Sequence, residues 1–171
     1  ALRYLVRMSI PTRTLGSTGE DVSIIGLGGG HIGSSSMTHR EAVRLIRYAI
    51  DQGVTFMDNA WEYAEGRSEA RMGEAIANRR DDVFLMTKVC ARDRDAALRQ
   101  LEDSLRRLRT DRIDLWQFHE VNYGNDHEWI FGPGGAIEAA RVALESGKVR
   151  HVGFTGHKDP AFHLSMLGYD F

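Results

Sequence analysis

The chain has 171 residues, of which 42% are hydrophobic and 27% charged, so it is long enough for one globular domain with a buried core. A formal net charge of −2 argues against a nucleic-acid partner, and no apolar run approaches the ~18 residues that would span a membrane. The single cysteine, Cys90, excludes an internal disulfide and suits a reducing compartment, so we expect a cytoplasmic protein.

The first residues predict an extension followed by a small hairpin. Residues 1–11 are interpreted as an N-terminal extension or tag. Residues 12–15 and 22–25 flank a turn-rich stretch, which is typical of two short antiparallel strands. An apolar strand then leads into three consecutive glycines. Thr38, with Glu41 three residues later, has the pattern of a capping box that begins a helix.

From there the chain alternates between short apolar runs and amphipathic helices. Such alternation predicts right-handed βαβ units that form a parallel sheet, and the sequence holds five strand–helix units. After the first unit, we expect strands at 54–57, 83–86, 113–118 and 149–154, and helices at 68–78, 98–108, 137–146 and 159–167.

Two architectures carry this alternation, an open dinucleotide-binding sheet and a closed barrel. Gly28, Gly30 and Gly33 spell G-x-G-x-x-G after a strand, and Asp58 ends the next strand, which is the outline of a dinucleotide-binding fingerprint. That fingerprint requires a helix N-terminus inside the glycine loop to face the pyrophosphate. Here the helix cap is at Thr38, beyond the last glycine, so the open sheet is disfavoured.

The positions of polar residues favour the barrel. Asp58, Lys88, His119 and Thr155 each lie at or just past the carboxyl end of a different apolar strand. In a β/α barrel these ends open on one face, where catalytic groups gather. We therefore predict a (β/α)8 TIM barrel with an N-terminal β-hairpin, of which about five β/α units are present in a single domain at 12–171.

The same residues suggest acid–base chemistry on a carbonyl. Lys88 follows a core strand, and a buried lysine needs a carboxylate partner such as Asp58. Tyr63 lies five residues past Asp58, and a nearby cation makes a phenol a better proton donor. His119 can donate a hydrogen bond to a carbonyl oxygen. None of these groups is a hydride source, so a cofactor is required.

Four motifs follow one another along the chain: GVTFMDNAWEY at 53–63, GRSE at 66–69 with GEA at 73–75, FLMTK at 84–88 and DLWQFH at 114–119. Together they resemble the aldo-keto reductases, and GFTGH at 153–157 looks more like the bacterial branch of that family. The resemblance covers about residue 12 to the C-terminus. It implies NADP-dependent reduction of an aldehyde or ketone to an alcohol.

The resemblance also implies a role for each matched residue. Tyr63 is the implied general acid, with Lys88 as the cation that assists it, Asp58 as the partner of Lys88, and His119 orienting the carbonyl. NADPH is expected to lie across the barrel mouth.

The predicted cofactor contacts are glycine backbone, a carboxylate and a hydroxyl, at Gly29, Gly30, Asp58 and Thr155. The family usually ends its fifth strand with a Ser/Thr-Asn pair, whereas this chain has Thr155-Gly156-His157, so an amide that would hold the nicotinamide is missing.

The substrate pocket is predicted to include His31, Trp61 and Trp129. Residues 121–135 form a long connection, which suggests a lid or binding loop, although its aromatic residues could instead pack over the barrel. No His, Cys or Asp grouping has metal-ligand spacing, so we expect no metal, and Cys90 is interpreted as an inert apolar residue.

Other functions remain open at this stage. The chain could be a cofactor-binding regulatory homologue with little turnover, a barrel that forms a Schiff base at Lys88, or an inactive fragment without the cofactor phosphate site. A usual barrel of ~250 residues predicts about 100 further residues in the complete gene product. The expected partner is a small carbonyl substrate, without nucleic acid or membrane. Two unpaired sheet edges would allow a homo-oligomer or an edge-mediated dimer.

Overall fold

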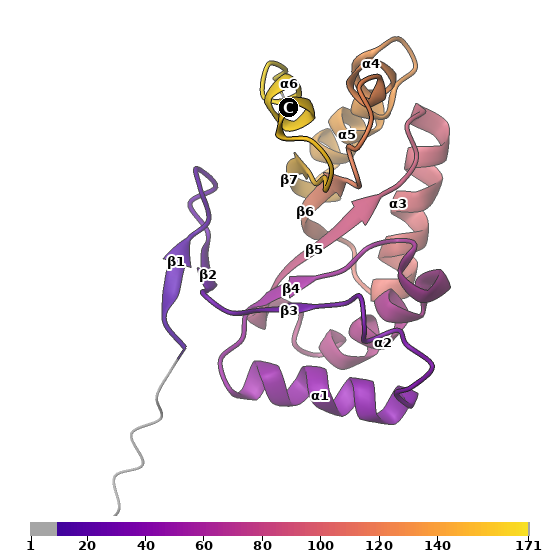
Figure 1. The fold of residues 1–171 in the computed structure, drawn as a ribbon. Helices are drawn as coiled ribbons and strands as arrows, with labels where there is room; N and C mark the ends of the chain where they lie inside the picture. Colours follow the sequence, from indigo (N-terminus) through magenta and orange to yellow (C-terminus); the bar gives the residue numbers. More distant parts are fainter. Residues whose placement is uncertain (1–9, 171) are drawn as a thin grey trace, which may run out of the picture.

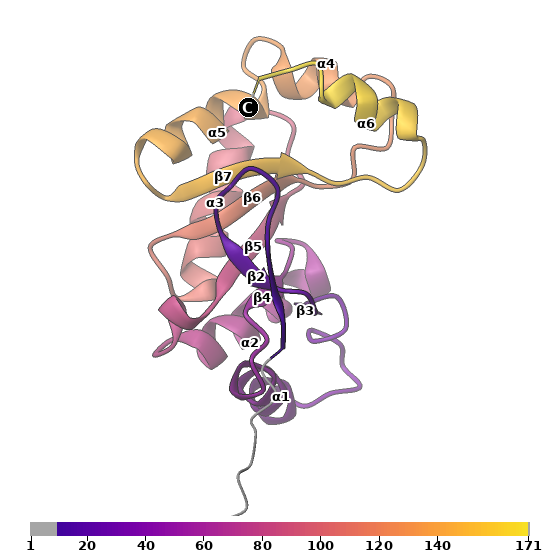
Figure 2. The same ribbon diagram turned by 90° about the vertical axis from the view of Figure 1, so that its left-hand side faces the viewer.

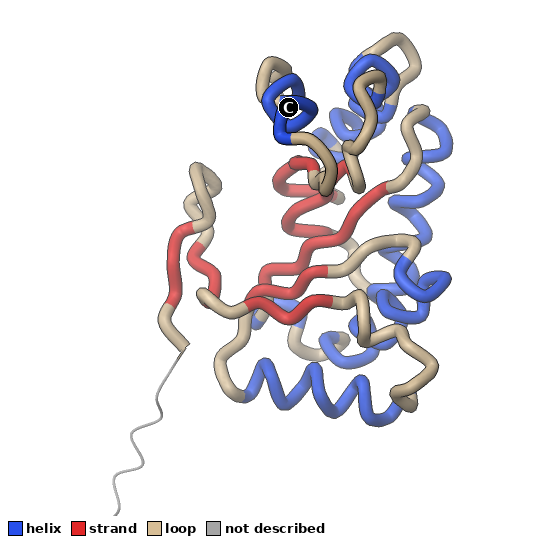
Figure 3. The backbone as a smooth tube through the Cα atoms, in the orientation of Figure 1, coloured by secondary structure: helices blue, strands red, loops and turns tan. Residues whose placement is uncertain are grey.

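A five-stranded parallel sheet with helices along one face forms the centre of the computed structural model, which describes residues 10–170 (Figures 1 and 3). The strands are hydrogen-bonded in chain order, β3-β4-β5-β6-β7. They are β3 (Gly26–Gly28), β4 (Phe56–Asp58), β5 (Phe84–Val89), β6 (Ile113–Phe118) and β7 (Val149–Phe154).

This strand order separates the two predicted architectures. In an open dinucleotide-binding sheet the order reverses after the first strands, and helices cover both faces. Here each new strand adds on the same side of the previous one, so the helices lie on the same face. The fold is therefore part of a (β/α)8 barrel, as predicted, and the Rossmann alternative is wrong. Within the described residues, the two edge strands β3 and β7 have no parallel partner on their outer sides.

The helices begin where the sequence places caps. The Thr38 side chain accepts from the Glu41 backbone N–H, and the Glu41 carboxylate accepts from that of Thr38 at 2.9 Å, which confirms the capping box. The helical segments are α1 (His39–Asp51), η1 (Tyr63–Gly66), α2 (Arg67–Ile76), η2 (Arg80–Asp82), α3 (Arg94–Leu108), α4 (Asp126–Phe131), α5 (Ala136–Glu145) and α6 (Pro160–Met166). None of the helices within residues 10–170 has the length and apolar character needed to cross a bilayer.

The core lies between the sheet and the helices. Leu85 and Val89 of β5 and Trp116 and Phe118 of β6 are almost completely buried against this layer. Burying one such side chain contributes about 1.5–3 kcal/mol. Because side chains alternate along a strand, Lys88 points to the opposite, concave face of the sheet.

The predicted hairpin is confirmed and lies at the amino ends of the strands. Strands β1 (Thr12–Thr14) and β2 (Asp21–Ser23) pair in antiparallel fashion. Ser23 and Thr55, which precedes β4, exchange backbone-to-hydroxyl hydrogen bonds of 2.9 Å in both directions. In Figure 2 the hairpin stands in front of the sheet, apart from α4 and α6. Of the predicted extension, residues 1–9 lie outside the described part, while Ile10 packs against the core.

Candidate active site at the carboxyl ends of the strands

Three consecutive strands bring polar side chains to one edge of the sheet. Asp58 ends β4, Lys88 is the penultimate residue of β5, and His119 directly follows β6. Tyr63 begins the short helix η1 after β4. The structure therefore gathers all four residues that the sequence predicted to act together, and their chemical roles remain predictions.

Lys88 is the central cation of this group. The residue is 4% exposed, and its ammonium donates to the Asp58 carboxylate and to the Asn59 carbonyl oxygen, the latter at 2.7 Å. The Asp58 side chain is 34% exposed, so one end of the ion pair is buried and the other faces the open edge. A buried ammonium requires such a counter-charge.

Tyr63 lies against both Lys88 and His119. The Lys88 nitrogen is 5.0 Å from the centre of the Tyr63 ring, and the His119 ring meets the Tyr63 ring edge-on, at 5.7 Å between centres and an interplanar angle of 76°. Directly after Tyr63, Ala64 and Glu65 adopt left-handed conformations, with φ of 51° and 58°. Non-glycine residues there cost roughly 1–2 kcal/mol each. The chain therefore turns sharply at Tyr63, at a cost in backbone strain.

His119 is a buried and neutral imidazole. Its backbone N–H continues the strand ladder to the Val89 carbonyl at 2.9 Å, and the residue is 4% exposed. Burial, followed by the nearby Lys88 charge, lowers the pKa of His119 to about 4. The Glu62 carboxylate, 3.0 Å from His119 Nδ1, acts in the opposite sense by favouring the protonated form, but desolvation dominates for a side chain buried this deeply.

Glu62 is a member of the site that sequence reasoning missed. It precedes Tyr63 in the same segment, and its carboxylate contacts His119, as given above. Cys90 also faces this histidine, with its sulfur 3.9 Å from His119 Nδ1. Burial raises the pKa of the Cys90 thiol to about 12, so the free thiol is protonated at neutral pH. The sequence signal for Glu62 and Cys90 was their position in the chain, next to Tyr63 and two residues after Lys88.

The predicted glycine contacts have a structural explanation. The Gly29 N–H donates to the Asp58 carbonyl at 2.6 Å, and the Gly29 carbonyl accepts from the Ser68 hydroxyl at 2.7 Å. A Cβ at Gly29 would lie 2.8 Å from the Asn59 side chain, so this position needs glycine for packing. Gly30 is exposed, with no neighbour within 4 Å of a hypothetical Cβ, and its backbone is open to a ligand.

Thr155 directly follows β7, and its hydroxyl and backbone already make hydrogen bonds within the protein. Its hydroxyl accepts from the Glu120 N–H at 3.1 Å, and its backbone pairs with Phe118 and Val121. The next residue, Gly156, has no room for a side chain, because a Cβ would lie 2.5 Å from the Val121 carbonyl oxygen and 2.1 Å from His163 Nε2. The family's amide at this position is therefore excluded by packing as well as by sequence.

The concave face nevertheless retains hydrogen-bonding capacity suited to a polar cofactor. Gln117 pairs in register with Lys88, so both side chains point to the same face. Gln117 Oε1 is buried and has no hydrogen-bond partner within residues 10–170. This amide oxygen and the part-exposed Asp58 carboxylate are acceptors suited to the polar nicotinamide end of such a cofactor.

The three residues predicted to line the substrate pocket lie in different surroundings. Trp61 turns toward α3, where its indole N–H donates to Asp103 at 3.4 Å and Arg107 covers its ring at 5.4 Å. Trp129, on α4, lines a cavity of about 290 Å³ together with Glu62 and His119. His31 is exposed in the loop after β3. The structure thus brings Trp129 to the cavity of the candidate site and occupies Trp61 elsewhere.

A parallel sheet in barrel order, with a carboxylate, a phenol, an ammonium and an imidazole at its carboxyl edge, has the arrangement of a β/α-barrel enzyme. Residues 24–163 match the model of the aldo/keto reductase family, and the chain belongs to this family.

Known proteins similar to the chain support this assignment. The uncharacterized oxidoreductase YqkF of Bacillus subtilis is 31% identical, over 84% of this chain and 48% of its own. The aldo-keto reductase AKR11C1 from Bacillus halodurans (holo form) has a TM-score of 0.78 at 27% identity, over 92% of this chain and 54% of its own. An aldo/keto reductase from Klebsiella pneumoniae, solved with NADP and acetate, has a TM-score of 0.75 at 31% identity, over 89% and 52%. The chain thus spans about half the length of these relatives.

Proposed function

We propose that the protein reduces an aldehyde or ketone to an alcohol with NADPH, and that Tyr63 is the general acid. The observation that carries this proposal is the convergence of Tyr63, Lys88 and His119. The Lys88 ammonium lies 5.0 Å from the Tyr63 ring centre, and the His119 ring meets the same phenol ring edge-on. Solved relatives with NADP or NADPH bound support the choice of cofactor.

Each side chain has a distinct task in this proposal. A bound nicotinamide cofactor supplies the hydride. The Tyr63 hydroxyl gives its proton to the developing alkoxide, and the Lys88 ammonium stabilises the phenolate that remains. Asp58 holds Lys88 through the ion pair described above. His119 is neutral, so one ring nitrogen carries a proton that can orient the substrate oxygen without adding a second cation beside Lys88.

The cofactor contacts and partners of the protein are part of this proposal. Gly30, Asp58 and Thr155 are the residues that we assign to the cofactor, with Gly29 holding the backbone beside Asp58. Trp129 is assigned to the substrate wall because it lines the cavity of His119. We propose a small carbonyl compound as the partner and a cytoplasmic location.

The decisive experiment is substitution of Tyr63 by phenylalanine. General acid catalysis contributes typically 10²–10⁴-fold, so turnover of reactive aldehydes by Tyr63→Phe should fall by about that factor. Cofactor binding, measured by fluorescence titration, should be retained. Tyr48→Phe is the matched control, because Tyr48 is 63% exposed on α1 and its loss should leave turnover unchanged.

Two results would contradict the proposal. Undiminished turnover of Tyr63→Phe would exclude the phenol as the acid. Tight cofactor binding by the unsubstituted protein, without turnover of any aldehyde or ketone, would favour a regulatory homologue instead.

A further inference from the structure

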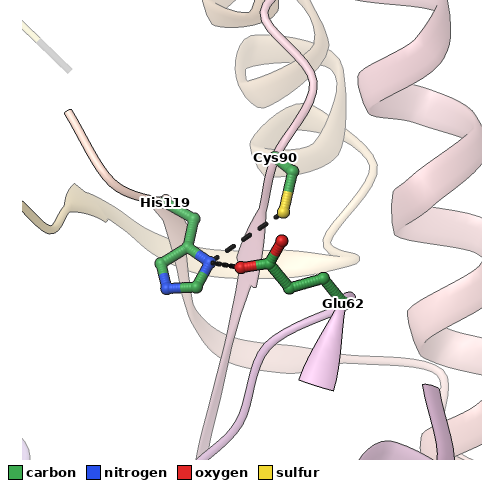
Figure 4. A group of neighbouring side chains, drawn as sticks. All are labelled: Glu62, Cys90 and His119. Atoms are coloured by element: carbon green, nitrogen blue, oxygen red, sulfur yellow. Dashed lines mark hydrogen bonds and ion pairs between the residues drawn. The ribbon is translucent and has the colours of Figure 1, made fainter. Parts of the chain in front are cut away.

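Three potential metal ligands face one another beside the candidate active site. Figure 4 shows the carboxylate of Glu62, the thiol of Cys90 and the imidazole of His119 converging on one point. His119 Nδ1 lies 3.0 Å from Glu62 Oε1 and 3.9 Å from Cys90 Sγ, and all three ligand atoms lie within 4.8 Å of one another. Sequence spacing predicted no metal site, because these residues belong to three separate strand ends.

The separations suit a tetrahedral ion. Zinc binds sulfur at about 2.3 Å, and nitrogen and oxygen at about 2.0–2.2 Å, which places neighbouring ligand atoms roughly 3.3–3.6 Å apart in a tetrahedron. The nitrogen–oxygen and nitrogen–sulfur distances at this site lie a few tenths of an ångström to either side of that range. Small side-chain rotations would therefore complete three coordination bonds.

The surroundings hold two of the ligands and leave room for a fourth. The Cys90 N–H donates to the Gln100 side chain at 2.9 Å, and the His119 N–H is fixed in the strand ladder. Glu62 is exposed and comes from a loop, so its carboxylate can adjust. The cavity of about 290 Å³ lined by these residues can admit water as the fourth ligand.

The charges nearby do not prevent such binding. Arg92 donates to the backbone carbonyls of Cys90 and His119, but its own charge is paired with Asp126 at 3.0 Å. The Lys88 charge is paired with Asp58. A divalent ion also deprotonates a coordinating thiol outright, so the protonated thiol of the metal-free protein is no obstacle.

We propose that Glu62, Cys90 and His119 form a binding site for a thiophilic divalent metal ion of the Zn²⁺ class. A thiolate, an imidazole and a carboxylate select such borderline ions over Mg²⁺ or Ca²⁺. On the proposed function given above, the ion is inhibitory, because it occupies the cavity that His119 and Trp129 line. The site thereby makes carbonyl reduction sensitive to free zinc.

The test is a metal titration of the whole protein after treatment with a chelator. Co²⁺ is the spectroscopic probe, since bound thiolate gives an intense near-ultraviolet charge-transfer band, and Zn²⁺ affinity is measured by competition with a chromophoric chelator. We expect one Co²⁺ with a thiolate band. Cys90→Ser should abolish the band, and both Cys90→Ser and Glu62→Gln should weaken Zn²⁺ binding by at least about tenfold.

The chain offers a matched control at another histidine. His39 and Glu74 form a histidine–carboxylate pair at the same 3.0 Å separation, on the surface. His39→Gln should leave the Co²⁺ spectrum and the Zn²⁺ affinity unchanged. A Co²⁺ complex without a thiolate band, or equal Zn²⁺ affinity in the unsubstituted protein and Glu62→Gln, would overturn the site.

Inhibition is measured separately, as the loss of each variant's own metal-free rate. Zn²⁺ should inhibit at the concentrations at which it binds, and Glu62→Gln should need at least about ten times more. Zinc that binds without slowing turnover would overturn the inhibitory role. If the protein reduces no carbonyl at all, the proposed function fails, while the binding titration still decides the metal site.

Discussion

Two ion pairs at opposite ends of the sheet differ in how many hydrogen bonds their carboxylates accept. At the amino ends, the Asp114 carboxylate accepts from Arg80 at 2.7 Å, from the Leu85 N–H at 2.8 Å and from Arg150 at 3.2 Å. Arg80 also donates to the carbonyls of Val83 and Arg112 and to the Thr110 hydroxyl. Arg80 thus uses four of its five N–H donors, and the Asp114 carboxylate accepts from three groups.

At the carboxyl ends the pair of Lys88 and Asp58 is less complete. Among the described residues, Lys88 is the one side chain that donates to the Asp58 carboxylate, which is 34% exposed. The Lys88 ammonium makes two of its three hydrogen bonds, to Asp58 and to the Asn59 carbonyl. Burial alone therefore does not show whether an ion pair stabilises the fold or is available to a ligand. A pair whose buried carboxylate accepts from several groups stabilises the fold, and a pair whose carboxylate is part-exposed with one side-chain donor is available to a ligand.

The largest effects are expected when one partner of each ion pair is removed. Asp114→Ala leaves Arg80 uncompensated at a buried position and should lower the free energy of unfolding by about 3–5 kcal/mol. Lys88→Met leaves Asp58, which water can reach, and should cost about 1 kcal/mol or less while turnover falls at least ~100-fold. Denaturant titration and a reductase assay measure both effects. Equal losses of stability for the two variants would refute the distinction.

Most of the fold could be predicted because it depends on local patterns. The capping box at Thr38, the apolar runs and the spacing of helices all act within a few residues, and the structure places the elements close to the expected positions. The gathering of Asp58, Lys88 and His119 also followed from sequence, because parallel strands present their carboxyl ends at the same edge.

What could not be predicted depends on side-chain direction and on distant packing. Trp61 was assigned to the substrate pocket, but its orientation is set by Asp103 and Arg107 of α3, some forty residues away. Glu62 and Cys90 meet His119 only because three strand ends converge, which spacing along the chain does not reveal. The packing demand at Gly29 likewise comes from Asn59 and Ser68.

The carboxyl ends of the strands, where the candidate active site lies, should also make the free energy of unfolding sensitive to acid. Because burial holds the pKa of His119 at about 4 against a usual value of 6.5, the unfolded chain binds a proton that the folded chain refuses between these values. The free energy of unfolding should therefore fall as pH drops from about 6.5 toward 4, by up to about 3 kcal/mol, and gain no contribution from His119 above 6.5. Thermal melts across this range measure the slope. His119→Gln should flatten it, and an equally steep slope in that variant would assign the effect to other groups.

The smallest effect concerns the strained turn after Tyr63, at the carboxyl ends of the strands. Glu65 has φ 58° and a side chain that is 91% exposed, so Glu65→Gly removes a left-handed penalty with little loss of contact. The free energy of unfolding should rise by up to about 1 kcal/mol. Glu102→Gly, in the exposed interior of α3, is the matched control and should lower it by about 1 kcal/mol. The two glycines should therefore have opposite signs in denaturant titration. If both destabilise, the turn is not strained, and the position of Tyr63 is then set by its packing against Lys88 and His119 alone.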